Sequence, residues 1–191
     1  MKTNLYILLA LLAFISLSSF TQTKKDKFRV EIWQDGKLLA NNNGVVQLAK
    51  KEFQIKVHLF EQEGVYVSSS YGNSYYGLKE TDEVPDLQEI GARTFAESTF
   101  NEDKDLILDN EGVSYWFYKP KQDWHRFDKD ISIEGKTVIG TKTIQHLFIL
   151  ENRSNVNIED VQKPLKLFFV ATTKGRKIKE LQRLNLQIQW L

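Results

Sequence analysis

The chain has 191 residues, no cysteine and a formal net charge of +1, from 26 Lys and Arg against 25 Asp and Glu. The absence of cysteine excludes disulfides, thiolate catalysis and cysteine metal sites, so core packing and β-ladder hydrogen bonds must hold the fold. A near-neutral charge argues against a nucleic-acid-binding protein, whose mark is a basic patch.

The N-terminus has the layout of a secretory signal peptide: Lys2, an apolar stretch at residues 5–15, then small and polar residues. Ser19 and Thr21 are suitable small residues before a cleavage point, which predicts a signal peptide at 1–21 and a mature single domain at 22–191. The apolar stretch is shorter than the roughly 20 residues that cross a bilayer, although a retained membrane anchor is the alternative. We expect export to the periplasm or the extracellular space, with no membrane span after cleavage.

Most of the mature chain alternates apolar and polar residues with the period of a β-strand. This pattern occupies residues 28–32, 53–59, 65–67, 113–117, 165–171 and 184–190. Asp35-Gly36 and Glu134-Gly135 lie between short runs of this kind, and both pairs predict hairpin turns. Helical signals are short, at 86–90 and 157–161.

Short alternating strands separated by turn residues predict an all-β fold. The polar residues on one side of each strand indicate antiparallel sheets with one wet face. We therefore expect an antiparallel two-sheet β-sandwich with immunoglobulin-like Greek-key connections and short helical turns in long loops. A closed β-barrel is the alternative.

A segment at about 68–103 matches no regular strand and predicts a long loop rich in Tyr, Ser and acidic residues. Tyr71, Tyr75 and Tyr76 lie there among Ser, Gly and Asn, a composition typical of adaptable protein-recognition surfaces. The segment is therefore a candidate recognition loop. Alternatively, the tyrosines fold back and cap the end of the core.

The run at 115–118 places aromatic residues on both faces of one predicted strand. We expect Tyr115 and Phe117 to face the core, and Trp116 and Tyr118 to face outward or to lie under a loop. Together with Trp124, the outward residues are candidates for a platform that stacks on sugar rings or anchors a peptide. A strand buried on both faces is the alternative.

Catalytic and metal-binding patterns are missing from the sequence. His58, His125 and His146 have neither the helical spacing nor the accompanying glutamate of a zinc site. The acidic run at 101–105 lacks the glycine and terminal glutamate of a calcium loop. Nucleophile elbows and phosphate loops do not occur. We therefore predict no cofactor, no metal and no catalytic residue.

These observations together predict an exported, non-enzymatic binding protein that recognises a protein partner, in an inhibitor, immunity-type or adhesion-like role. One alternative is a carbohydrate-binding module that uses the aromatic platform. Another is a hydrolase whose site assembles from scattered carboxylates and histidines. The third is a structural component of the cell envelope without a discrete ligand.

Overall fold

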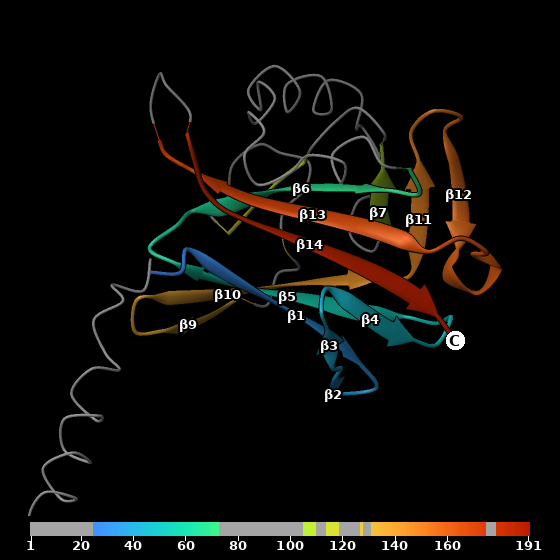
Figure 1. Ribbon diagram of the computed structural model, residues 1–191, viewed down its shortest axis with the longest axis horizontal. Helices are drawn as coiled ribbons and strands as arrows, with labels where there is room; N and C mark the ends of the chain where they lie inside the picture. The colour runs from blue at the N-terminus through green and yellow to red at the C-terminus, as the bar shows by residue number, and fades with distance from the viewer. Residues whose placement is uncertain (1–24, 73–104, 110–113, 119–126, 128–130, 175–178) are drawn as a thin grey trace, which may run out of the picture.

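The computed structural model describes residues 25–72, 105–109, 114–118, 127, 131–174 and 179–191. These residues form an all-β structure of three sheets, one of which curls into a half-barrel (Figure 1). The predicted all-β class is confirmed. None of the helices in this part of the chain is long and apolar enough to cross a membrane.

The first sheet has five strands and is antiparallel throughout. In spatial order they are β2 (Lys37–Leu38), β1 (Phe28–Gln34), β5 (Phe53–Phe60), β10 (Thr137–Ile144) and β9 (Ser132–Glu134). The predicted turn at Asp35-Gly36 joins β1 to β2, and both turn residues have positive φ values of 52° and 72°. The type I′ hairpin turn requires this backbone conformation, which explains why Asp-Gly stands there.

The second sheet has six strands. Their order is β3 (Asn41–Asn42), β4 (Val45–Leu48), β14 (Glu180–Trp190), β13 (Leu165–Thr172), β6 (Gly64–Ser70) and β8 (Ser114–Phe117). Central strand β13 is buried on both faces, because Leu167 and Phe169 point one way, Phe168 and Val170 point the other way, and all four are fully buried.

The third sheet has three strands, which Figure 1 shows grouped at one end of the molecule. They are β12 (Ser154–Asn157), β11 (His146–Ile149) and β7 (Asp105–Leu108). Only Gln145 separates β10 from β11, so one run of chain bends there and passes from the first sheet into the third. A 3₁₀ turn at Ile158–Asp160 follows β12 and confirms the short helical turn expected at 157–161.

The topology differs from the expected pair of antiparallel sheets. Two pairings are parallel, β14 with β4 and β11 with β7, and the immunoglobulin-like Greek-key arrangement is not established. The three sheets nevertheless share one hydrophobic core, to which Phe28, Leu106, Leu147 and Phe169 all belong. The bent run of chain in β10 and β11 belongs to two sheets, and one sheet is curled. The three sheets can therefore share one core without forming a two-layer sandwich.

The first residues of the predicted loop at 68–103 belong to a strand, and residues 73–103 lie outside the described residues. Strand β6 continues to Ser70, and the side chains of Ser68, Ser69 and Ser70 are buried. Ser69 donates its hydroxyl to the carbonyl of Ile107, and Asp109 donates its backbone N–H to the Ser69 carbonyl at 2.9 Å. These contacts join β6 to β7, which explains why a run of small polar residues forms a buried strand here.

Candidate binding cleft at the open edge of strand β1

The structure places the predicted aromatic platform differently from the sequence expectation. Trp116 is 2% exposed and lies in the core, where its ring meets Phe127 and Phe169 edge-on at centroid distances of 5.9 and 6.1 Å. Tyr115 lies on the opposite face of β8 against Tyr66. The expected orientation of this strand was therefore wrong, because Trp116 faces the core in place of Tyr115. Trp116 offers no exposed face for stacking.

The remaining predicted site residues do not come together in the described structure. Tyr71 follows the end of β6, whereas Tyr118 donates its backbone N–H at 3.4 Å to Glu63, just before β6 begins. At about 3.3 Å per residue, the length of β6 separates them by roughly 25 Å. Both side chains pack partly against the core, and burial raises the pKa of Tyr71. Tyr75, Tyr76 and Trp124 lie outside the described residues.

A different region has the shape of a binding site. An open cleft of about 510 Å³ lies between β1, the chain that follows β2, and strands β4 and β14. Its apolar lining consists of Val30, Ile32, Leu38, Leu39, Val46 and Leu186. Clefts of a few hundred cubic ångströms with apolar walls and a few polar groups are typical of ligand sites.

Strand β1 presents a free edge to this cleft. Its other edge pairs with β5 from Phe28 to Trp33, whereas β2 covers only Trp33 and Gln34. Phe28 and Ile32 direct their backbone groups away from β5, since Phe28 bonds Gln182 and the Ile32 carbonyl accepts from Leu39 N–H at 2.9 Å.

Backbone groups two residues apart on a strand point the same way, so the N–H and C=O of Val30 face the cleft. Among the described residues, no strand pairs with β1 at Val30 on that side.

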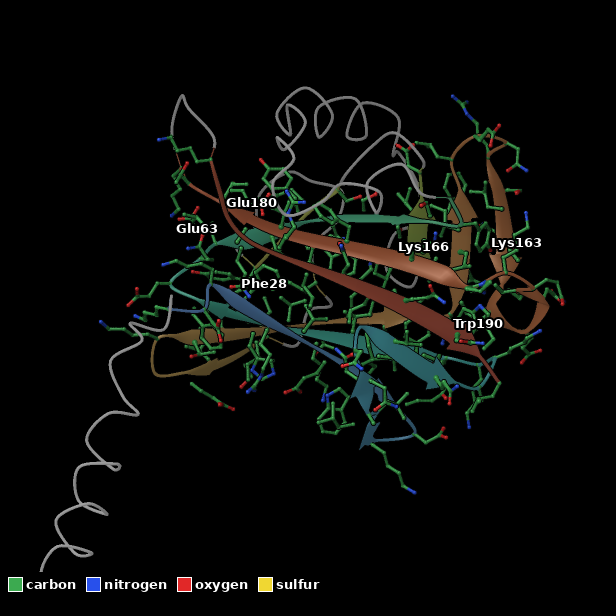
Figure 2. The ribbon with its side chains drawn as sticks, viewed as in Figure 1. Phe28, Glu63, Lys163, Lys166, Glu180 and Trp190 are labelled. Carbon is green, nitrogen blue, oxygen red and sulfur yellow. The ribbon has the colours of Figure 1, made fainter. Side chains whose placement is uncertain are left out.

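The Gln182 side chain shows how this edge binds an amide group. Its Oε1 accepts the backbone N–H groups of Lys27 at 2.6 Å and Phe28 at 3.1 Å, and its Nε2 donates to the Phe28 carbonyl at 2.9 Å. A single side-chain amide thereby occupies the place of a neighbouring strand and ties β1 to β14. Phe28 lies at the start of β1 in Figure 2, so this bridge occupies the open edge of the strand at that end.

The polar rim of the cleft carries a structured charge network. Glu31 accepts from the Trp33 indole N–H at 2.9 Å and lies 3.2 Å from His58 and 3.1 Å from Arg29. Burial opposes ionisation of Glu31, yet the hydrogen bonds from Trp33 and His58 and the neighbouring charges lower its pKa below the ordinary value. The Glu31 side chain is 17% exposed and that of Arg29 is 60% exposed. The accessible charge at this rim is therefore positive.

The two histidines that the structure describes lie in different surroundings. His58 belongs to the network with Glu31 and Arg29, and His146 lies on β11. His125 lies outside the described residues. Within the ranges that the structure describes, no group of His, Asp and Glu side chains is placed to hold a metal ion.

Comparisons with protein-family models, with curated proteins and with solved structures give no match to this chain. The cleft therefore has to be interpreted from its own geometry.

Sequence reasoning identified β1 as a strand but missed its open edge. One signal for it is present in the sequence. The turn at Asp35-Gly36 is followed, only a few residues later, by a second turn at Asn43-Gly44, where both residues again have positive φ values, 53° and 85°. The strand between two such turns is too short to cover the length of β1.

Proposed function

We propose that this protein is an exported, non-enzymatic binding protein that holds an extended segment of a protein partner along the open edge of β1. The observation that supports this function is the edge of β1 at Val30, which no described strand pairs and which borders an apolar cleft. An extended polypeptide carries alternating donors and acceptors that match a strand edge, and its alternate side chains enter pockets beside it. Sugars and small apolar molecules lack this pattern.

The rival functions have less support. A carbohydrate platform needs exposed aromatic faces, and the central residue of the expected platform, Trp116, lies in the core. A hydrolase needs carboxylates or histidines that converge on a cleft. The carboxylate that lines this cleft, Glu31, is engaged by Trp33, His58 and Arg29.

The proposal is tested by filling the cleft. Ala40 lines the cleft and is exposed, so Ala40→Trp places a large ring in the binding space without disturbing the core. Asn42 is exposed on β3 and does not line the cleft, so Asn42→Trp is the matched control. A candidate partner is first identified by pull-down from an envelope extract, and its affinity for each variant is then measured with purified proteins.

We expect Ala40→Trp to weaken binding at least about ten-fold, or about 1.4 kcal/mol, and Asn42→Trp to leave it unchanged. Hydrogen exchange should show protection of the Val30 amide in the complex. Equal affinity of the wild type and Ala40→Trp for the partner would overturn the proposed function.

A contribution from the tyrosine-rich segment is a separate hypothesis. Replacing Tyr71, Tyr75 and Tyr76 together with Ala is expected to weaken partner binding by at least ~2 kcal/mol if these rings contact the partner, the usual threshold for a hot spot. If they only cap the core, the same variant loses thermal stability and keeps its affinity.

Export is tested by N-terminal sequencing of the protein recovered outside the cytoplasm, which should begin at Gln22. Recovery of a chain that retains Met1 would contradict cleavage.

A further inference from the structure

The open edge of β1 also limits which segments it can accept. Phe28 is held by Gln182, and the Ile32 carbonyl is held by Leu39, so Val30 is the residue between them that offers both backbone groups. One residue of an antiparallel partner exchanges both hydrogen bonds with the residue opposite, whereas a parallel partner needs two flanking residues. The antiparallel direction, which needs the shorter stretch of chain between the Gln182 and Leu39 contacts, is therefore favoured for a segment centred opposite Val30.

The residue opposite Val30 must be apolar. Directly opposed residues point to the same face of a sheet, so its side chain enters the cleft beside Val30. The floor there is made by Ile32, Val46 and Leu186, which are 1–2% exposed, and Leu38 stands at the edge with 54% of its surface exposed. An apolar side chain that enters this space removes Leu38 and itself from water.

The next residue of the segment meets Arg29. In an antiparallel segment, the residue after the one opposite Val30 lies opposite Arg29, with its side chain on the outer face of the sheet. Arg29 uses Nη2 toward Glu31 at 3.1 Å and toward His58 at 3.4 Å, and its side chain is 60% exposed. A guanidinium has five N–H donors in a fork that fits a carboxylate, so the remaining donors favour an acidic residue at this position.

We propose that the cleft selects partner segments in which an apolar residue is followed directly by Asp or Glu. This inference rests on the proposed function and adds the chemistry of the partner. It depends on direction as well as composition, because a segment of the reverse order that keeps its apolar residue opposite Val30 places its carboxylate opposite Glu31 instead of Arg29.

The test uses three blocked hexapeptides and the isotope-labelled mature protein. Each peptide has two threonines on either side of a central pair, which is Leu-Asp, Leu-Lys or Asp-Leu. Titration is followed by the nuclear magnetic resonance shift of the Val30 amide. We expect the Leu-Asp peptide to bind about three- to ten-fold more tightly than the Leu-Lys peptide. This is the expected effect of replacing a repulsive cross-strand pair of Lys and Arg29 with an attractive pair of Asp and Arg29. The Asp-Leu peptide should bind more weakly than the Leu-Asp peptide, because its carboxylate meets Glu31 when its leucine lies opposite Val30 and meets the apolar floor when its aspartate lies there.

Arg29→Gln should bring the Leu-Asp and Leu-Lys peptides to within about two-fold of each other, and so should salt at about 0.5 M. Lys37 is exposed on β2 and does not line the cleft, so Lys37→Gln removes the same charge as a matched control and should keep the preference.

Equal binding of the Leu-Asp and Leu-Lys peptides to the wild type, with shifts at Val30, would overturn this inference and leave the proposed function standing. A Val30 amide that responds to none of the three peptides would overturn both.

Discussion

Truncation of Gln182 is the most direct test of how β1 is held against β14. In Gln182→Ala the side-chain amide is lost, and with it the hydrogen bonds to Lys27 N–H, Phe28 N–H and the Phe28 carbonyl. No other described side chain bonds the backbone of Phe28 on this side. We expect the start of β1 to loosen from β14 while its pairing with β5 persists.

The magnitude follows from the three bonds. Each contributes about 0.5–1.5 kcal/mol net, which sets a range of roughly 2–4 kcal/mol for a fully buried site. The three bonds of Gln182 are only partly buried, so water can replace them in part. The expected cost is therefore about 2 kcal/mol, equivalent to a fall of about 4–8 °C in melting temperature for a domain of this size.

The assay is urea unfolding together with hydrogen exchange at the Phe28 amide. Gln189→Ala is the matched control, because Gln189 is exposed on the same strand and the structure gives its side chain no hydrogen bond; it should change stability by less than about 0.5 kcal/mol. Equal destabilisation by the two variants, or an unchanged exchange rate at Phe28 in Gln182→Ala, would refute the bridging role.

Three further predictions concern buried and ionisable side chains. Val57 is fully buried, so Val57→Asp should lower the free energy of unfolding, measured with urea, by at least about 3 kcal/mol. Lys56→Asp loses only the contact of the Lys56 ammonium, 4.0 Å from the centre of the Trp33 ring, and should lower it by about 1 kcal/mol. Burial raises the pKa of Tyr115 from the ordinary tyrosine value of 10.0 to about 12. The neutral phenol therefore stabilises the fold below pH 10, and this stabilisation is lost as the pH rises through 12. Tyr115→Phe should shift alkaline unfolding to higher pH. The lowered pKa of Glu31 stabilises the fold above the ordinary carboxyl range and is lost on acidification, so Glu31→Gln should flatten the fall in melting temperature at acid pH. An acid or alkaline profile identical to that of the wild type would contradict the respective assignment.

Much of the local structure is predictable from alternation and turn chemistry. The period-two pattern at 28–32 and 53–59 places Val30, Ile32 and Val57 on one face, and the register Val30 to Val57 confirms it. The Glu134-Gly135 turn aligns Ile133 with Val138 as expected. These features depend on neighbours in sequence, and local backbone preferences decide them.

Strand orientation was not predictable where both faces of a strand are apolar. In the run at 115–118 every residue is aromatic, so alternation cannot tell which set faces the core. The structure buries Trp116 because its strand neighbour β6 turns Val65 inward opposite it. That pairing joins positions about fifty residues apart in the sequence, and no local pattern encodes it.

The candidate site was missed for a similar reason. A strand edge is open or closed according to which strands lie beside it, and Gln182 of β14, which meets the start of β1 on its open side, lies more than 150 residues away in the chain. Composition drew attention to the tyrosines at 71–76, because aromatic side chains are visible in a sequence and an unpaired backbone group is not.

The way β1 is left open bears on the kind of segment that the proposed site accepts. Exposed sheet edges invite pairing with other edges, and proteins limit this by keeping edges short, charged or obstructed. Here Gln182 obstructs one end, Leu39 and the chain after it obstruct the other, and the exposed Arg29 adds charge beside the gap. For the proposed function, these two obstructions disfavour the broad edge of a second folded sheet at Val30. A single extended segment is thin enough to enter, and the apolar floor then favours one inserted side chain. The features that protect this edge from aggregation therefore also favour a flexible region of a partner over a second folded sheet.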